Sequence, residues 1–253
     1  MHQTPIPRDA LNNTASVKKT ELVIVMPVYN EAEIIETVLD DWIAVLDTLD
    51  CDYVVHAFND GSTDDSLSIL QGYAGRCTRL QVHDKANAGH GPTVLKGYKE
   101  FCDAAPWLFQ VDSDNEVQAA MFPQFWAQRQ GYDFIIGRRV GEQRPLIRRI
   151  MSTCAATIVR LIFGEGVHDV NCPYRLMRAE VFRDLYRAIP DDTFSPNLVV
   201  AGYAAASGLR RLEIPVRYRT RKTGTVSIRK LKIIRAIVSS VIEIIRLRGV
   251  RQG

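Results

Sequence analysis

The sequence predicts an α/β protein built on a mainly parallel sheet. Over roughly the first 110 residues, short apolar runs alternate with segments of helical periodicity, which is the pattern of consecutive strand–helix units. Polar, acid-rich segments follow three of the apolar runs. In parallel sheets, ligands bind beyond the carboxyl ends of the strands, where such segments gather. A chain of 253 residues can bury the core of one such domain with an appendage.

The elements of the first half each have a signal of their own. Leu22–Val28 is a continuous apolar run and predicts a buried strand. In residues 31–46 apolar side chains recur at helical spacing, and Asn30 with Glu33 fits a capping box at the helix start. The same patterns predict strands at 53–58, 80–83 and 107–111, and helices at 64–73 and 92–101, the last begun by a proline in its first turn.

The second half carries fewer signals. Strands are expected at 134–136 and 212–216, the latter at a sheet edge because Pro215 lacks a backbone N–H. Residues 1–20 are polar and predict a flexible tail, and 21–227 form the main domain. Residues 228–253 predict a basic amphipathic helix, which either lies on a membrane surface or packs on protein. Its charged interruptions argue against a membrane span.

Composition bounds the classes of partner. The formal net charge is +3, and basic residues gather in the second half, which suits an anionic partner. The basic segments lack interleaved aromatic residues and a nucleic-acid-binding motif, so we expect no nucleic acid partner. Five widely spaced cysteines without a CxxC pair indicate reduced cytosolic thiols. No secretory signal is recognisable, and we expect a cytoplasmic protein.

Acidic side chains at strand ends are the candidates for chemistry. Asp112 and Asp114 follow a buried strand two residues apart, so both carboxylates can point the same way. Hard oxygen ligands of this kind suit Mg²⁺ or Mn²⁺ shared with substrate phosphates, and the alternative is a turn with two solvated acids. Residues 85–92 form a glycine-containing loop before a helix, a place that favours anions. This loop matches neither the Walker A nor the dinucleotide-binding pattern.

Together these segments resemble the family-2 glycosyltransferases, specifically the dolichyl-phosphate mannose synthase type of polyprenyl-phosphate sugar synthases. PVYNE, NDGSTDDS, KANAGHG and DSDNE resemble the family's P-x-Y-N-E, D-D-G-S-x-D, K-N-x-G-x-G and D-A-D-x-Q motifs. Residues 136–138, 169–175 and 215–227 resemble its G-S-R, D-x-x-x-G-[FY]-R and P-V-R…G-x-S segments. The resemblance covers residues 22–230. It implies a GT-A (Rossmann-like) catalytic domain at 21–227 and an inverting transfer.

The resemblance also implies roles for particular residues. In the donor site, the positions that match the family's nucleotide-sugar contacts are Pro27, Tyr29, Glu31, Asp60 and Asp112, to which we add Lys85 and Gly89 of the glycine loop. In the metal site they are Asp112, Asp114 and Glu116, and near the phosphates they are Arg138, Arg148 and Ser152. The expected catalytic residues are Asp114, Arg138, Arg148 and Asp169. Asn59, Glu116 and Pro173 depart from the family pattern.

The acceptor is predicted from a missing motif. The late T/G-E-D and Q-x-x-R-W of sugar-polymer synthases, which supply a base for a hydroxyl acceptor, are absent from the sequence. A phosphate acceptor is already ionised, with a second pKa of about 6, and needs cations to hold it. Arg138, Arg139, Arg148 and Arg149 suit that clamp, although a solvated basic face is the alternative for at least two of them. Asp169 is the candidate base if one is needed, and a salt bridge to Arg175 is its alternative.

We therefore expect a hexosyltransferase that uses GDP-mannose or UDP-glucose as donor and polyprenyl or dolichyl phosphate as acceptor. It would act at the cytoplasmic face of a membrane, through its C-terminal helix and with a separate membrane subunit as a possible partner. Two alternatives stay open: transfer to a saccharide hydroxyl, and a non-catalytic nucleotide-binding protein on the same fold. Retention of both metal aspartates argues against the second alternative.

Overall fold

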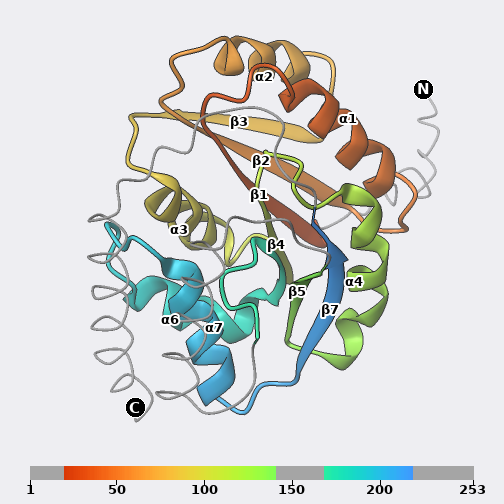
Figure 1. Ribbon diagram of the computed structural model, residues 1–253, viewed down its shortest axis with the longest axis vertical. Coiled ribbons are helices and arrows are strands. Elements are labelled where there is room, and N and C mark those ends of the chain that lie inside the picture. The colour runs from red at the N-terminus through yellow and green to blue at the C-terminus, as the bar shows by residue number, and fades with distance from the viewer. Residues whose placement is uncertain (1–19, 141–167, 219–253) are drawn as a thin grey trace, which may run out of the picture.

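The computed structural model describes residues 20–140 and 168–218 of the chain. In these residues seven strands form one sheet in the order β3-β2-β1-β4-β6-β5-β7 (Figure 1). The strands are β1 Leu22–Val28, β2 Tyr53–Asp60, β3 Leu80–Lys85, β4 Trp107–Val111, β5 Phe134–Val140, β6 Tyr174–Arg178 and β7 Arg211–Arg217. The helices are α1 Ile35–Leu46, α2 Ser66–Ala74, α3 His90–Phe101, α4 Phe122–Gln128, α6 Ala179–Ala188 and α7 Pro196–Ala206, with 3₁₀ turns η2 Ala119–Met121 and η3 Arg129–Gly131.

The sheet is mainly parallel, as the sequence predicts. β2 pairs in parallel with β1 and β3, and β1 pairs in parallel with β4. β6 runs antiparallel to both of its neighbours, β4 and β5, and β7 pairs in parallel with β5. The carboxyl ends of β1, β2 and β4 therefore meet at one edge of the sheet, and the residues that follow them are the three acid-rich segments of the sequence.

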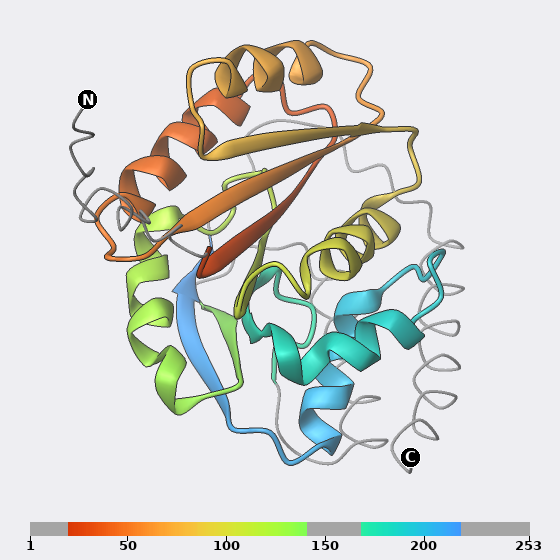
Figure 2. The same cartoon turned by 180° about the vertical axis from the view of Figure 1, so that it is seen from behind.

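Helices cover both faces of the sheet (Figures 1 and 2). On one face α3 packs across β1, β2 and β4, and α6 and α7 pack beside it. Its close approach requires Gly97, where a Cβ atom would lie 2.4 Å from Cγ1 of Val25. On the opposite face the ring of Trp42, on α1, packs at an angle against Phe109 and Phe122, at centroid distances of 5.5 and 5.7 Å. β4 thus presents Phe109 to one layer and Gln110 to the other, as strand alternation requires.

The predicted strands at 22–28 and 107–111 are confirmed with the same bounds, the others are longer by one or two residues at an end, and the strand predicted at 134–136 continues through Val140. The strand predicted at 53–58 continues through Asp60, so the first two residues of the second acidic segment belong to β2. β7 is an edge strand that contains Pro215, also as predicted. No local sequence pattern predicted β6, α4, α6 or α7. The tail, the C-terminal helix with its domain boundary, Arg148, Arg149 and Ser152 lie outside the described residues.

The predicted capping box at α1 is wrong. The helix begins at Ile35, and the residue before it, Ile34, makes no side-chain capping bond. Asn30 instead adopts a left-handed conformation with φ of 54°, which asparagine tolerates better than most residues. Its side-chain oxygen accepts a hydrogen bond from the backbone N–H of Thr63 at 2.7 Å. A residue that resembles a helix cap therefore connects the loops after β1 and β2. In the parts of the chain that are described, none of the helices is long and apolar enough to cross a bilayer.

His56 and His83 form a hydrogen-bonded pair between β2 and β3. Nδ1 of His56 lies 2.9 Å from Nε2 of His83, and the His56 ring stacks on Phe101 with 3.7 Å between centroids. His56 is 4% exposed. Burial, together with the neighbouring His83, lowers the pKa of His56 to about 3. The folded protein therefore holds His56 neutral at a pH where the unfolded chain protonates it.

This histidine predicts a loss of stability on mild acidification. The free energy of unfolding does not depend on the protonation of His56 above pH 6.5, and it falls as the pH drops from 6.5 towards 3. In that range the unfolded chain binds a proton at His56 and the folded protein does not. By pH 5 the loss is about 2 kcal/mol, at 1.36 kcal/mol per pKa unit. Urea unfolding of the wild type and of His56→Phe, at pH 7 and pH 5, measures it. The wild type should lose about 2 kcal/mol more than the variant, and equal losses would contradict a neutral buried His56.

Candidate functional site

The loops after β1 and β2 are hydrogen bonded to each other. The backbone N–H groups of Asn30, Glu31 and Ala32 donate to Ser62 Oγ, Ser66 Oγ and Asp64 Oδ2 at 3.1, 2.8 and 3.1 Å. Burial opposes the charge of Asp64, but hydrogen bonds from Ser66 and the backbone hold its pKa below the usual range. These bonds fix the positions of the predicted nucleoside contacts: Pro27 and Glu31 are buried, and Tyr29 is 45% exposed.

Asp60 holds the glycine loop against the end of β2. Its carboxylate accepts hydrogen bonds from Lys85 Nζ and from the backbone N–H groups of Ala88 and Gly89, both at 2.8 Å. Burial disfavours the charge, but the bonds from Lys85 and Ala88 keep the pKa of Asp60 below its usual range. Gly89 has φ of 95°, which favours glycine. The structure thus brings Asp60, Lys85 and Gly89 together, while their contacts with a donor remain a prediction.

Asp112 and Asp114 follow β4 and line one cleft. Oδ1 of Asp112 accepts from Gln110 Nε2 and lies 2.8 Å from His90 Nε2, at the first residue of α3. Partial burial opposes a charged His90, but Asp112 and Asp114 raise its pKa above the usual range. Oδ1 of Asp114 accepts from the backbone N–H of Glu116 at 3.1 Å. This tight turn is possible because Asn115 adopts a left-handed φ of 55°.

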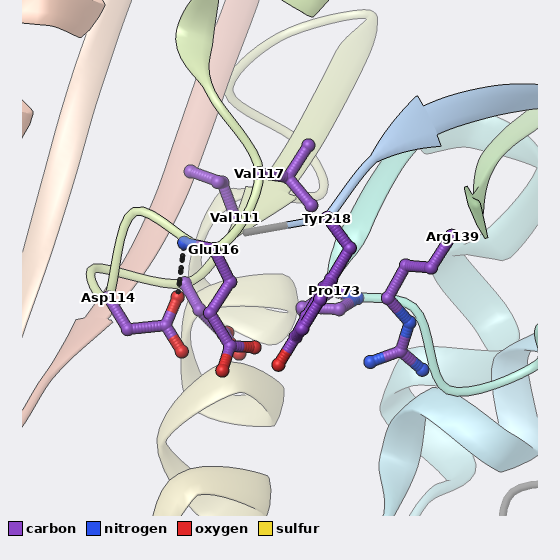
Figure 3. Close-up of a pocket in the computed structure, with 8 residues that line it drawn as sticks. Val111, Asp114, Glu116, Val117, Arg139, Pro173 and Tyr218 are labelled. Carbon is purple, nitrogen blue, oxygen red and sulfur yellow. Dashed lines mark hydrogen bonds between the residues drawn. The ribbon is translucent and has the colours of Figure 1, made fainter. Parts of the chain in front are cut away.

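Glu116 lies between the aspartates and an aromatic side chain that the sequence analysis missed. In Figure 3 the Glu116 carboxylate and the Tyr218 hydroxyl lie side by side, and the Arg139 guanidinium lies on the other side of the tyrosine. Burial and a hydrogen bond to Glu116 raise the pKa of Tyr218. These side chains line a small cleft that opens to solvent; its lining consists of Val111, Asp112, Asp114, Glu116, Val117, Arg139, Pro173 and Tyr218.

Arg139, rather than its neighbour Arg138, lies at the cleft. Successive residues of a strand point to opposite faces, and along the end of β5 Arg138 is exposed and is not among the residues that line the cleft. The match of residues 136–138 to the family's G-S-R segment pointed to Arg138, and Arg139 entered only as one of four candidates for the phosphate clamp. Tyr218 follows β7, whose Val216 pairs with Arg139. Its position one residue beyond a parallel strand was the signal that could have identified it.

Asp169 is paired with Arg139. The Nε and Nη2 atoms of Arg139 donate to its two carboxylate oxygens at 2.8 and 2.7 Å, and the Arg139 backbone N–H donates at 3.1 Å. The two side chains are 8% and 11% exposed. Burial opposes the charge of Arg139, but the bond to Asp169 raises its pKa further. The alternative for Asp169, a salt bridge to Arg175, does not form, because Arg175 is fully buried and donates to the backbone carbonyls of Val170, Cys172 and Asn197.

The carboxylates fit an open divalent metal site. Mg²⁺ and Mn²⁺ bind oxygen ligands, often one or two carboxylates with substrate phosphates completing the coordination. Asp112 has one oxygen, Oδ2, to which no described residue donates. Within residues 20–140 and 168–218, no three His, Cys, Asp or Glu side chains come together as a ready-made metal cluster. A cation would thus be held by Asp112 and Asp114, while Glu116 is turned to Tyr218.

Sequence comparison gives one family and a set of named relatives. Residues 23–186 match the family model described as glycosyl transferase family 2. The undecaprenyl-phosphate 4-deoxy-4-formamido-L-arabinose transferase of Edwardsiella ictaluri (strain 93-146) is 27% identical over 214 residues, which are 83% of this chain and 64% of that protein. The enzyme of the same name from Sodalis glossinidius (strain morsitans) is 24% identical over 87% of this chain and 67% of that protein. The chain spans just under two thirds of the first relative.

Structural comparison gives the same fold. Glucosyl-3-phosphoglycerate synthase from Mycobacterium tuberculosis, crystallised with Mn²⁺ and UDP-glucose, superposes with a TM-score of 0.64 at 14% identity, covering 89% of this chain and 79% of that chain. Mannosyl-3-phosphoglycerate synthase from Rubrobacter xylanophilus superposes with a TM-score of 0.63 at 12% identity, covering 92% and 76%. The predicted GT-A fold is confirmed by the observed sheet and these neighbours.

The buried pair at the cleft predicts a coupled effect on stability. Asp169→Asn leaves the Arg139 guanidinium buried without its counter-charge and should lower the free energy of unfolding by about 3 kcal/mol. The double variant Asp169→Asn with Arg139→Met buries no charge and should recover much of that loss. Urea unfolding of the wild type, both single variants and the double variant measures the coupling. Strictly additive losses in the double variant would show that the two side chains do not stabilise each other.

Proposed function

Because this chain belongs to glycosyl transferase family 2, we propose that it transfers a sugar from a nucleotide-sugar to a polyprenyl phosphate. The family and the fold make the protein a glycosyltransferase. The acceptor is the part that we propose. The observation that carries it is the cleft, which is lined by both candidate metal carboxylates and by the buried Arg139 guanidinium, with Glu116 and Tyr218 between Asp114 and Arg139 (Figure 3).

The partners of the cleft carboxylates favour an acceptor that brings its own negative charge. Both oxygens of Asp169 are held by Arg139, and Glu116 is hydrogen bonded to Tyr218. Asp112 and Asp114 are the metal candidates. Among the described residues of the cleft, each carboxylate thus either has a hydrogen-bond partner or is a proposed metal ligand. None of them is assigned to remove a proton from a hydroxyl acceptor. An ionised phosphate needs no such base, and the N–H groups of Arg139 that do not bond to Asp169 would donate to it.

The proposed reaction is a displacement at the anomeric carbon of the donor sugar. A bond forms between this carbon and an oxygen of the acceptor phosphate, while the bond from the carbon to the donor diphosphate breaks. The electron pair of the broken bond stays on the departing nucleoside diphosphate. A bound Mg²⁺ or Mn²⁺ supplies charge neutralisation at that diphosphate. Arg139 reduces the repulsion between the two phosphate groups, and Asp60 with Lys85 holds the glycine loop against the end of β2.

The relatives support a lipid-linked acceptor. Their names specify undecaprenyl phosphate as acceptor and 4-deoxy-4-formamido-L-arabinose as sugar. Mannose from GDP-mannose and glucose from UDP-glucose remain our sequence-based candidates, and the formamido sugar joins them as a third. A polyprenyl chain is confined to a bilayer by its apolar surface, so the reaction would take place at the cytoplasmic membrane surface. The C-terminal helix and a separate membrane subunit are the proposed means of reaching it.

A donor and acceptor screen tests this function. The full chain, with Mn²⁺ or Mg²⁺ and undecaprenyl phosphate in detergent, is incubated with GDP-mannose, UDP-glucose or nucleotide-activated 4-deoxy-4-formamido-L-arabinose. We expect one donor to give a lipid-extractable sugar phosphate and free nucleoside diphosphate. Sugar on a soluble saccharide acceptor would indicate transfer to a hydroxyl. Nucleotide binding without turnover of these donors, in a fully folded sample, would indicate a non-catalytic protein.

The metal carboxylates predict a sharp loss of turnover. Asp114→Asn keeps the side-chain volume but removes a charge from the proposed cation site, and kcat should fall by about 100- to 1000-fold, a loss of several kcal/mol in transition-state stabilisation. Asp65→Asn is a matched control, because Asp65 is an exposed acid at the start of α2 that makes no side-chain cap bond there. A kcat of Asp114→Asn within threefold of that of the control would show that Asp114 does not bind a catalytic metal ion.

A further inference from the structure

A buried row of polar side chains connects the interior of the protein to Asp112. The hydroxyl of Tyr98, on α3, donates to Asn197 Oδ1 at 3.0 Å. Asn197, on α7, donates through Nδ2 to Gln110 Oε1 at 3.2 Å, and Gln110, on β4, donates through Nε2 to Asp112 Oδ1 at 2.8 Å. Tyr98 and Gln110 are fully buried, and Asn197 is 5% exposed. The row joins the consecutive elements α3 and β4 to α7, which lies 87 positions beyond Gln110 in the sequence.

The direction of these hydrogen bonds is fixed at the Asp112 end. An ionised carboxylate can only accept, so Gln110 must present its NH₂ group to Asp112 and its carbonyl oxygen to Asn197. Asn197 must then present its own NH₂ group to Gln110, which leaves its oxygen for the Tyr98 hydroxyl. Each amide has one orientation in which all three bonds form. A reversed Gln110 would place its carbonyl oxygen against the Asp112 carboxylate.

Asn197 is itself held in place by Arg175. The fully buried Arg175 donates through Nη1 to the backbone carbonyl of Asn197 at 2.9 Å and through Nη2 to the carbonyl of Cys172 at 2.7 Å. This fixes the first turn of α7 against the segment that precedes β6. Because the buried amides have little room to move, the row can determine the orientation of the carboxylate at its end.

We propose that Gln110 and Asn197 are positioning residues for the divalent cation. They hold Asp112 through Oδ1, with His90 on the same oxygen, so that Oδ2 is kept for the metal. Strand alternation supports this, because Gln110 and Asp112 are two residues apart and point to the same face. The inference rests on the proposed metal role of Asp112. Substitution of such supporting hydrogen-bond partners typically weakens metal binding by about 10- to 100-fold.

Mn²⁺ binding, measured by electron paramagnetic resonance of free Mn²⁺ in the presence of UDP or GDP, tests the proposal without turnover. Gln110→Met keeps the length of the side chain and removes the donor to Asp112, and it should weaken Mn²⁺ binding at least tenfold. Tyr98→Phe is the matched control. It also removes one buried hydrogen bond and should lower the melting temperature, but it leaves the bond from Gln110 to Asp112 intact, so Mn²⁺ binding should stay within about threefold.

The outcomes separate this inference from the proposed function. If the wild type binds Mn²⁺ and a folded Gln110→Met binds it within threefold, the positioning role is overturned and the metal site stands. If the wild type binds no Mn²⁺ with either nucleotide, the metal role of Asp112 fails, and the inference fails with it. If circular dichroism shows that Gln110→Met does not fold, the Asn197→Leu variant tests the positioning role instead. Removing the partner that orients Gln110 should weaken Mn²⁺ binding several-fold, and unchanged affinity overturns the proposal.

Discussion

The carboxylate of Asp60 is the constraint on which the arrangement of the site depends. It is almost completely buried at the end of β2, and a buried charge must be compensated by hydrogen bonds or a counter-charge. Lys85 and the N–H groups of Ala88 and Gly89 provide both, so the chain after β3 wraps around Asp60 before it enters α3. This fixes the start of α3, where His90 meets Asp112, and the same helix carries Tyr98 to Asn197.

The acidic residues at the edge of the sheet divide into structural and chemical groups. Asp60 and Asp64 accept hydrogen bonds from neighbouring loops, and their pKa values are held low. Asp169 neutralises Arg139, and Glu116 is paired with Tyr218. Asp112 and Asp114 are the pair that we propose for a divalent cation. Compensation of the other acids thus holds the loops in place around two carboxylates that face an open cleft.

Local patterns predicted the strands well because a strand that is buried on both faces of the sheet appears in the sequence as a continuous apolar run. β1 and β4 were predicted to the residue, since all their side chains are buried. The capping box failed because Asn30 and Glu33 suit a helix start in any chain, whereas here Ser62 and Thr63, more than 30 residues away, compete for Asn30. The salt bridge to Arg175, considered as an alternative for Asp169, does not form for a related reason: tertiary packing surrounds Arg175 with backbone carbonyls instead.

The sequence by itself determined the α/β class, the three acidic strand ends and the pair Asp112 and Asp114, because strand pattern and turn chemistry are local. It also identified the family, through motifs spread along the chain. Only the tertiary structure decided that Arg139 rather than Arg138 faces the cleft, that Tyr218 closes it beside Glu116, and that Gln110 and Asn197 support Asp112. These depend on the face of a strand and on contacts between α7, α3 and β4. Local sequence patterns do not predict these contacts, because packing brings together residues that are as much as 99 positions apart.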